Sequence, residues 1–349
     1  MFNGSSKTKS SYSLNDVLHT GPILQNDLVS VILNWRLYKY VFNGDIEKMY
    51  RQICVHDSDR QYQRILFRKE VQSDIKDYEL CTITFGINCA PYLAIRTLLQ
   101  LAEESRDKCP IASKIIKNEI YVDDVLTGGH TLASALEAEK QLICVLNSAG
   151  FPLKKITANH PTLLSNVRSE DLLNEEFLRI KDMSSTKTLG IRWNALTDSF
   201  SYSMKSLEVT TPITKRKILS TISKLFDPAG WLTPLIIQAK ILLQDLWLEG
   251  VNWDERVSSS TYTKWKTFLD QFSSVDSIQI PRWINYCLEG NIQFHGFCDA
   301  SEKAYCAAVY VRMDTESKSS VNLLIAKSKV SPLKRVSLPR LELCGAVLL

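Results

Sequence analysis

The sequence predicts an α+β protein with more than one domain. At 349 residues, the chain is long enough to form two or three hydrophobic cores. Apolar residues recur at helical spacing in several segments, including Gln25–Tyr38, Thr131–Ala149 and Thr211–Glu249. Shorter runs of β-forming residues lie between them, in an order that would place strands side by side. We therefore expect antiparallel sheets packed against helices.

The composition excludes several classes of protein. Hydrophobic residues make up 45% and charged residues 23%, which is ordinary for a soluble globular protein. No apolar run approaches the length of a membrane span, and residues 1–6 lack the apolar core of a secretion signal. The nine cysteines form no Cys-x-x-Cys pair, and the five histidines are dispersed. These features predict an intracellular, cytoplasmic protein without a membrane partner or a structural zinc site.

The charge is unevenly distributed along the chain. Residues 1–150 carry 17 basic and 18 acidic side chains, a net charge of −1. Residues 151–240 carry 13 basic and 8 acidic side chains, a net charge of +5, and residues 241–349 carry 12 of each. A basic middle segment beside a carboxylate-bearing first segment favours a polyanion held near a metal site. The alternative is a solvated lysine-rich face.

Two adjacent carboxylates at Tyr121–Asp124 (Tyr-Val-Asp-Asp) form the most distinctive local pattern. Apolar β-formers flank Asp123 and Asp124, so the segment is typical of a strand, a tight turn and a second strand. Turn chemistry does not require the second Asp, because Asp-Gly or Asn-Gly would serve better. Neighbouring carboxylates repel, and a hard divalent cation such as Mg²⁺ removes that repulsion. A plain surface turn is the alternative for these four residues alone.

A second source of carboxylate lies at the end of the apolar segment Tyr40–Ile46, which is predicted to be a strand running into Asp45. Asn43-Gly44 could instead form a hairpin turn, which would leave Asp45 as a turn neighbour. If the strand is continuous, Asp45 can converge with Asp123 and Asp124. Three such carboxylates can hold two Mg²⁺ or Mn²⁺ ions about 3.5–4 Å apart for in-line phosphoryl transfer.

Further elements follow from local patterns. We expect a strand from Tyr62 to Arg68, a polar connection over residues 69–78, and a strand from Leu80 to Phe85. A helix is expected to start at residues 88–91, where Pro91 suits the first turn. A hairpin is expected over residues 188–204 and, near the end of the chain, three strands over residues 292–298, 305–312 and 321–326. A final helix is expected to start near Pro339.

These motifs resemble those of reverse transcriptases. Tyr121–Asp124 resembles the family's Tyr/Phe-x-Asp-Asp motif, and Asp45–Tyr50 resembles the motif with the first catalytic Asp. The resemblance implies a right-hand polymerase palm, with Asp45, Asp123 and Asp124 as catalytic and metal-binding residues. It also implies nucleotide-binding roles for Tyr50, as the residue that excludes a 2′-hydroxyl, and for Phe85, Gly86 and Lys155. Primer or template contacts are implied for Tyr121, Leu189, Gly190 and Trp193.

The sequence resembles BEL/Pao-type retrotransposon polyproteins more closely. The matching segments are Ser13–Leu18, Asp45–Tyr50, Phe226–Leu232 and Leu338–Leu343. The resemblance covers nearly the whole chain. Several motifs in the same order make the resemblance specific. It implies a palm with residual fingers over residues 1–205, a helical thumb or connection over 206–285, and the first part of a ribonuclease H-like domain over 286–349. No Asp-Ser/Thr-Gly motif of the family's protease is present.

The last segment resembles the start of a ribonuclease H domain, in which four acidic residues bind two metals. Asp299, on an expected strand, and Glu342, on an expected helix, match the first two of these acids. The chain ends before the others could occur, so the resemblance implies a truncated domain that does not cut RNA in a hybrid.

A basic segment, Lys215–Lys217, begins the helix expected near residue 215. Cations at a helix N-terminus oppose the helix dipole by roughly 0.3–1 kcal/mol each. Contact of Lys215, Arg216 and Lys217 with the phosphates of a template-primer duplex would explain them, as expected of a polymerase thumb. A solvated face remains the alternative for each of them.

The leading hypothesis is therefore an RNA-directed DNA polymerase fragment of a retrotransposon Pol polyprotein. The implied partners are an RNA or DNA template with its primer, dNTPs, and other segments of the polyprotein. An inactive or host-adopted nucleic-acid-binding remnant is the main alternative, since most of the fingers are missing from this chain. A third hypothesis, an unrelated metal-dependent phosphotransferase, would not explain the segments that resemble a thumb and a ribonuclease H domain.

Overall fold

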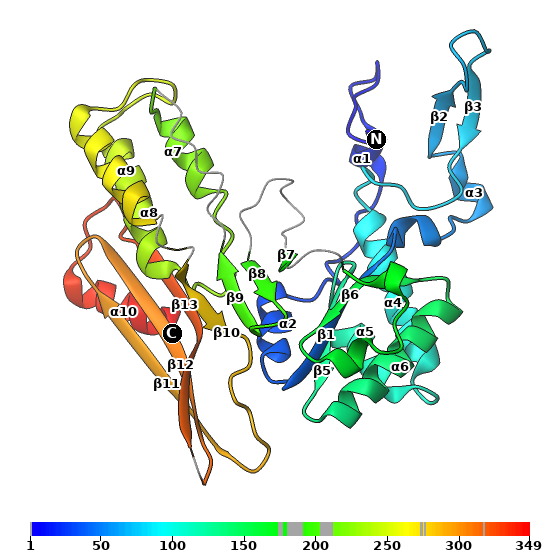
Figure 1. Cartoon of the computed structure of the whole chain (residues 1–349). Helices are drawn as coiled ribbons and strands as arrows, with labels where there is room; N and C mark the ends of the chain where they lie inside the picture. Colours follow the sequence, from blue (N-terminus) through cyan, green and yellow to red (C-terminus); the bar gives the residue numbers. More distant parts are fainter. Residues whose placement is uncertain are drawn as a thin grey trace. The chain divides into compact units, whose positions relative to one another are not determined.

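The computed structural model describes residues 2–173, 177–179, 191–202, 212–272, 275, 277–316 and 318–349. The chain divides into two compact units, Met1–Asn174 and Glu175–Leu349 (Figure 1). Each unit combines helices with antiparallel sheets, which confirms the expected α+β class. Within the described residues, no helix is both long and apolar enough to cross a membrane. All nine cysteines lie in the described residues, and none of them forms a disulfide.

The first unit is built around a four-stranded sheet with the order β4-β5-β1-β6. Its strands are β4 (Ile120–Tyr121), β5 (Asp124–Gly129), β1 (Tyr40–Ile46) and β6 (Leu153–Ala158), and each neighbouring pair is antiparallel. Strand β1 is continuous, because its register with β5 runs without a break from Tyr40 to Asp45. The hairpin alternative at Asn43-Gly44 is therefore excluded.

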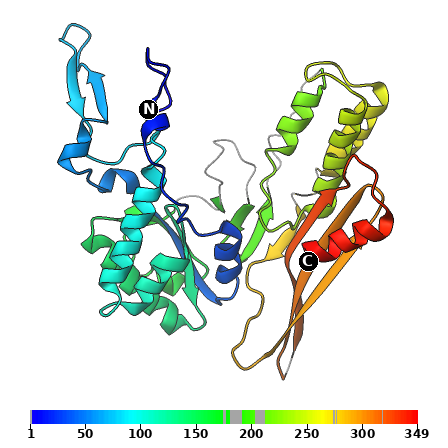
Figure 2. The same cartoon turned by 180° about the vertical axis from the view of Figure 1, so that it is seen from behind.

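Three helices pack with this sheet: α4 (Ala90–Ser105), α5 (Pro110–Asn118) and α6 (Leu132–Ser148). Figure 2 shows them together beside the blue strand β1. Helix α6 begins at Thr131, whose hydroxyl accepts from the Ser134 N–H, and ends before Gly150, whose φ is +75°. These helices and the sheet share one apolar core, which includes Phe42, Leu98 and Leu142. The sequence pattern predicted α4 and α6 but missed α5.

Shorter elements complete the first unit. Helix α2 (Leu28–Trp35) contacts β4 and β5, and its Trp35 donates from Nε1 to the Thr127 carbonyl at 3.1 Å. The remaining elements are α1 (Leu14–Val17), η1 (Met49–Gln52), α3 (Asp57–Arg60), η2 (Pro161–Leu164) and η3 (Ser169–Asp171).

A separate hairpin joins β2 (Arg64–Phe67) to β3 (Lys76–Glu79). The expected strand from Leu80 to Phe85 is wrong, since the strand lies earlier, in the segment expected to be a polar connection. Arg64 explains the difference, because its guanidinium pairs across the hairpin with Asp77 at 2.9 Å and Glu79 at 2.7 Å. Cross-strand ion pairs of this kind stabilise a strand that has no apolar face.

The second unit holds a four-stranded sheet with the order β10-β9-β8-β7. Its strands are β7 (Phe177–Arg179), β8 (Ile191–Asn194), β9 (Ser199–Tyr202) and β10 (Gln279–Pro281). The predicted hairpin over residues 188–204 is found as β8 and β9, and its remaining residues lie outside the described ranges. Because this hairpin pairs with β10, it belongs to the second unit. The two compact units meet at residue 174, and the expected end of the palm at residue 205 stays a prediction.

Three long strands form a further sheet in the order β11-β12-β13, with β11 at Asn291–Ala300, β12 at Ala304–Asp314 and β13 at Ser319–Val330. The helices are α7 (Lys215–Ile222), α8 (Thr233–Leu248), α9 (Ser259–Phe272) and α10 (Leu338–Leu348). Helix α8 contacts β13, and α10 contacts β11 and β12.

The segment Phe226–Leu232 forms the turn before α8, and contacts with other elements explain its residues. The Asp227 carboxylate accepts from the Tyr202 hydroxyl at 2.7 Å and from the backbone N–H groups of Trp231 and Leu232. Burial raises the pKa of Asp227 despite these hydrogen bonds. Gly230 has a φ of +72°, and a Cβ atom there would collide with the Ala326 carbonyl of β13. The segment Phe226–Leu232 therefore connects β9, α8 and β13 through its contacts.

Candidate functional site

The sequence-predicted acids meet on strands β1 and β5. The register pairs Asp45 with Asp124, and the Ile46 N–H donates to the Asp123 carbonyl at 2.8 Å. Hydrogen-bonded and narrow pairs alternate in an antiparallel ladder, so Asp45 and Asp124 occupy a narrow pair with Cα atoms ~4.5 Å apart. Their side chains leave the same face of the sheet. Like charges directly opposite destabilise a sheet, so a cation at this point would relieve a cost of the fold.

The turn between β4 and β5 carries the third acid. Tyr121 pairs with Asp124, so Val122 and Asp123 are its two central residues. Val122 has a φ of +59°, the sign expected at the first central position of a type II′ turn, where glycine is usual. A β-branched residue in this conformation costs on the order of 1–3 kcal/mol. Val122 is only 8% exposed, so packing against the core holds the strained turn in place.

Lys155 of β6 brings a positive charge to the acids. Its Nζ lies 3.0 Å from Asp45 Oδ2, and its backbone φ is +51°. The hydrogen bond to Asp45 raises the pKa of Lys155, against burial, and the charges of Asp45, Asp124 and Asp123 raise it further. All three carboxylates are therefore close enough to act on one ammonium group. Lys155 was expected to bind nucleotide, and here it pairs with a predicted catalytic acid.

The site suits a hard divalent cation in the chemistry of its donors. Carboxylate oxygens are the ligands that Mg²⁺ and Mn²⁺ select, and two of the three carboxylates face each other across the narrow pair. In the part of the chain that the structure describes, no group of three or more His, Cys, Asp or Glu side chains is already arranged to hold a metal ion. The acids fit the ion in type and in backbone placement, and their side chains would have to turn toward it.

Tyr50 and Phe85 form an aromatic pair near the acids. Their ring centroids lie 4.7 Å apart, and Phe85 is 50% exposed while Tyr50 is 5% exposed. Burial raises the pKa of Tyr50, and the charge of Asp123 raises it further. Among the residues that the structure describes, the Tyr50 hydroxyl has no hydrogen-bond partner. The pair thus presents one exposed ring beside a buried, unsatisfied hydroxyl next to Asp123.

Gly86 makes a close contact different from the expected one. Its φ is +97°, and a Cβ atom there would lie 2.1 Å from the Phe2 carbonyl oxygen. Asn15 of α1 donates from Nδ2 to the Gly86 carbonyl at 3.0 Å and accepts from the Asn88 N–H at 2.9 Å. The glycine therefore accommodates the N-terminal segment of this chain. These hydrogen bonds link the segments around Asn15 and Asn88.

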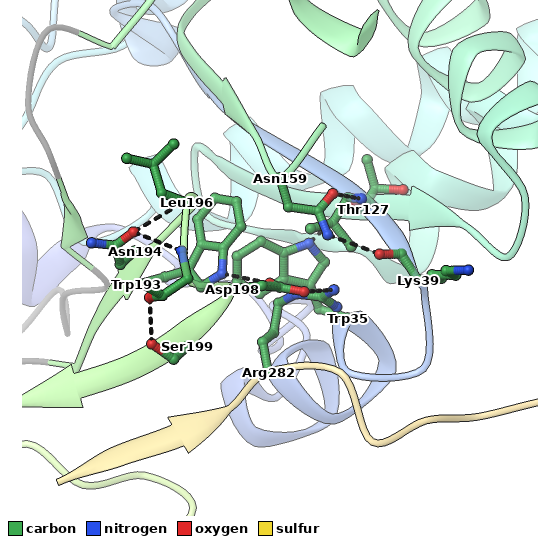
Figure 3. A network of polar contacts seen from close by, with 12 residues as sticks. Trp35, Lys39, Thr127, Asn159, Trp193, Asn194, Leu196, Asp198, Ser199 and Arg282 are labelled. Atoms are coloured by element: carbon green, nitrogen blue, oxygen red, sulfur yellow. Dashed lines mark hydrogen bonds and ion pairs between the residues drawn. The ribbon is translucent and has the colours of Figure 1, made fainter. Parts of the chain in front are cut away.

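Trp193, which was expected to contact the primer, makes a hydrogen bond within the protein. Its side chain is fully buried and donates from Nε1 to Asp198 Oδ1 at 3.0 Å (Figure 3). Asp198 also binds the buried Arg282, through Nε at 2.6 Å and Nη2 at 2.7 Å. Burial lowers the pKa of Arg282. Trp193 therefore has no exposed surface for nucleic acid, and Leu189 and Gly190 lie outside the described residues.

The basic start of α7 is also revised. Lys215 is 4% exposed, and its ammonium lies 3.6 Å from the ring centroid of Trp247 and donates to the Val251 carbonyl. Arg216 pairs with Asp254 through two hydrogen bonds of 2.7 and 2.9 Å. These contacts explain both cations without phosphate, so the expected duplex contact is not the best account of them. For Lys217 and Tyr121, nucleic-acid contact stays a prediction.

The two acids of the second unit are not paired in the same way. Asp299 lies on β11 opposite Cys306, and its carboxylate accepts from the Ala300 N–H at 2.8 Å. Glu342 lies on α10, and both side chains are exposed. Helix α10 approaches this end of β11 at Gly345, where a Cβ atom would lie 3.4 Å from the Asp299 carbonyl. The fold thus brings the helix to the strand, as expected.

Several residues that shape these sites were missed by sequence reasoning. The Asp198–Arg282 pair is separated by 84 positions, and no local pattern indicates it. Trp247 and Trp253, which contact Lys215, lie beyond the basic segment and were not connected with it. The one available signal for this contact was the presence of a lysine and two tryptophans, because an ammonium group can pack over a tryptophan ring.

A family model and solved structures are similar to this chain. Residues 214–349 match the family model described as Pao retrotransposon-like RNaseH-like domain. The match begins at Thr214, so it also covers helices that were expected to form a separate thumb or connection. No curated protein matches the chain in sequence.

Solved structures extend the comparison to nearly the whole chain. The foamy viral protease-reverse transcriptase in complex with RNA/DNA hybrid is 13% identical with a TM-score of 0.58, and it covers 96% of this chain and 39% of its own. The foamy viral protease-reverse transcriptase dRH in complex with double-stranded DNA is 12% identical with a TM-score of 0.60 and covers 96% of this chain and 51% of its own. The fold is therefore similar to retroviral reverse transcriptase structures, and this chain spans about half or less of their length.

Proposed function

We propose that this chain is the RNA-directed DNA polymerase part of a retrotransposon Pol polyprotein, which transfers a nucleotide from a dNTP to a primer 3′-hydroxyl. The observation that carries the proposal is the direct opposition of Asp45 and Asp124, with Asp123 in the adjoining strained turn. The family match over residues 214–349 and the similarity in fold to foamy viral protease-reverse transcriptases support it.

The proposed roles follow from the positions of the side chains. Asp45, Asp123 and Asp124 would hold two Mg²⁺ ions, with Mn²⁺ as a substitute. When bound, such ions activate the primer hydroxyl and stabilise the charge that develops on the leaving pyrophosphate. Asp45 and Asp124 lie opposite each other on paired strands, and Asp123 follows Val122 in the turn between β4 and β5. Phe85, exposed beside Tyr50, offers a ring for contact with the incoming nucleotide.

The proposed partners are a template with its primer and other segments of the polyprotein. The two foamy viral structures contain RNA/DNA hybrid and double-stranded DNA, which supports a nucleic-acid duplex as the partner here. Both are more than half again as long as this chain, which leaves room for further segments to contribute to binding and catalysis. Because Lys215 and Arg216 have partners within the protein, other cations would make more of the expected phosphate contacts.

The test is extension of a labelled DNA primer on an RNA template by the purified chain, with Mg²⁺, with Mn²⁺ and with neither. The proposal requires metal-dependent extension that is abolished by Asp45→Asn. Asp74→Asn, in the exposed connection between β2 and β3, is the matched control and should extend normally. If the chain binds template-primer but never extends it, the account of an inactive or host-adopted nucleic-acid-binding remnant replaces the polymerase.

A further inference from the structure

We propose that Lys155 is an internal competitor of the divalent cation, whose ammonium holds the Asp45 carboxylate and must leave it before metal can bind. The inference rests on the proposed function, because it takes Asp45, Asp123 and Asp124 as the metal ligands. It adds a positioning residue that makes occupation of the site conditional on a side-chain exchange.

The contact itself is specific. Lys155 Nζ lies 3.0 Å from Asp45 Oδ2, and the Asp45 side chain is 24% exposed. The Lys155 side chain is 62% exposed, which leaves it room to swing into solvent when a stronger cation arrives. Partly exposed ion pairs are weak, so a divalent ion can displace the ammonium.

The backbone directs Lys155, rather than its neighbour, to the acid. Asp45 is opposite Lys154 in the register of β1 and β6, so a regular strand would turn Lys155 to the other face. The left-handed φ of Lys155 and the irregular register near Asp45 break that alternation. Lys154 instead binds Asp171, which also accepts from Arg168 Nε at 2.9 Å. Two adjacent lysines therefore have separate partners.

This pairing explains why the acids are placed for a metal but are not gathered around one. No three-ligand group is preformed among the described residues, and the Asp45 carboxylate pairs with the Lys155 ammonium. One ammonium offsets one carboxylate, whereas a divalent ion offsets two. Exchange therefore becomes favourable when metal is abundant, or when a bound polyanion attracts the released lysine.

The experiment is a Mn²⁺ titration of the full chain without nucleic acid, read by the loss of the free-ion electron paramagnetic resonance signal. Lys155→Met removes the competing charge and keeps the length of the side chain, so we expect roughly fivefold tighter binding. Lys155→Arg keeps the charge and should bind like the wild type. Lys154→Met is the matched control, because it removes the same charge from the adjacent residue, and it should change the affinity by less than about twofold.

The outcomes separate the two proposals. If Asp45→Asn binds Mn²⁺ as tightly as the wild type, the acids are not the ligands and the proposed function fails. If Asp45→Asn loses binding but Lys155→Met binds no tighter, only the role of Lys155 is overturned. An equal gain for Lys154→Met and Lys155→Met would also overturn it, since it would indicate a general charge effect. Matched thermal unfolding curves for the variants establish that each one is folded.

Discussion

The two units carry acidic residues in contrasting ways. In the first unit, Asp45 and Asp124 lie on neighbouring strands whose register fixes them opposite each other, beside the core. In the second unit, Asp299 lies on the outer strand β11 and Glu342 lies on a helix, and both are exposed. Strand register determines the first arrangement, whereas the second depends on how α10 packs. In the first unit, the positions of Asp45 and Asp124 are therefore set within one sheet.

The largest expected difference between the units is in polymerase activity. Asp124→Asn should reduce primer extension by about 10³-fold or more, because it removes charge that stabilises the transition state. Asp299→Asn, the equivalent change in the second unit, should leave extension unchanged. Rates from labelled-primer assays at saturating template check both. Loss of extension in Asp299→Asn with a normal thermal unfolding curve would contradict the assignment of catalysis to the first unit.

The same Asp124→Asn change should not destabilise the fold. It removes a like charge opposite Asp45 but also an attraction to the Lys155 ammonium, so the melting temperature should change little. A clear fall in melting temperature would mean that the carboxylate makes a structural contact that matters more than the repulsion.

The second unit depends more on a buried ion pair. Arg282→Ala should cost about 3 kcal/mol of unfolding free energy, because it removes the buried guanidinium that pairs with the Asp198 carboxylate. Arg312→Ala, which breaks the exposed pair with Asp314, should cost less than about 1 kcal/mol. Urea unfolding of both variants checks the difference. Equal costs would show that burial of Arg282 does not make its pair stronger.

A pH effect is expected in the first unit. Burial raises the pKa of Glu139 on α6 to about 7 from an ordinary value of 4.5. The folded state therefore binds more protons between these values, so stability falls as pH rises from about 4.5 to 7 and is level above that. The loss is on the order of 1–3 kcal/mol.

Glu139→Gln should remove this slope, and Glu137→Gln, an exposed neighbour on the same helix, should retain it. Urea unfolding at several pH values between 4.5 and 8 measures both. A slope that survives in Glu139→Gln would assign the pH dependence to another group.

The smallest expected difference separates two buried tyrosines. Tyr202→Phe should cost about 1–2 kcal/mol, since its hydroxyl donates to the buried Asp227 at 2.7 Å. Tyr50→Phe should be neutral or slightly stabilising, because its buried hydroxyl has no partner among the described residues. Thermal unfolding compares them directly. A loss for Tyr50→Phe as large as that for Tyr202→Phe would reveal a stabilising hydrogen bond made by the Tyr50 hydroxyl.

Much of the fold could be predicted from periodicity and turn residues. The strand at Tyr40–Ile46, the helix that ends before Gly150 and the three long strands of the second unit all follow from local patterns. Helix α5 was missed because it is short and follows α4 closely. The strand β3 was missed because its residues are charged and depend on Arg64, a partner from the other side of the hairpin.

The site was predictable where local sequence carries the chemistry. Asp45, Asp123 and Asp124 could be singled out, although only strand register shows that two of them are directly opposed. Partners across long separations could not be inferred, so Trp193 and Lys215 were assigned to nucleic acid although both are buried. The pairing of Lys155 depends on one left-handed backbone angle, for which the sequence holds no signal.

The most direct test of the central claim is an anomalous diffraction experiment on the chain crystallised with template-primer, a dNTP and Mn²⁺. The account predicts two anomalous peaks about 3.5–4 Å apart, with carboxylate oxygens of Asp45, Asp123 and Asp124 as ligands and Lys155 released from Asp45. Mn²⁺ peaks elsewhere, with Asp45 still paired to Lys155 while nucleic acid and dNTP are bound, would contradict it.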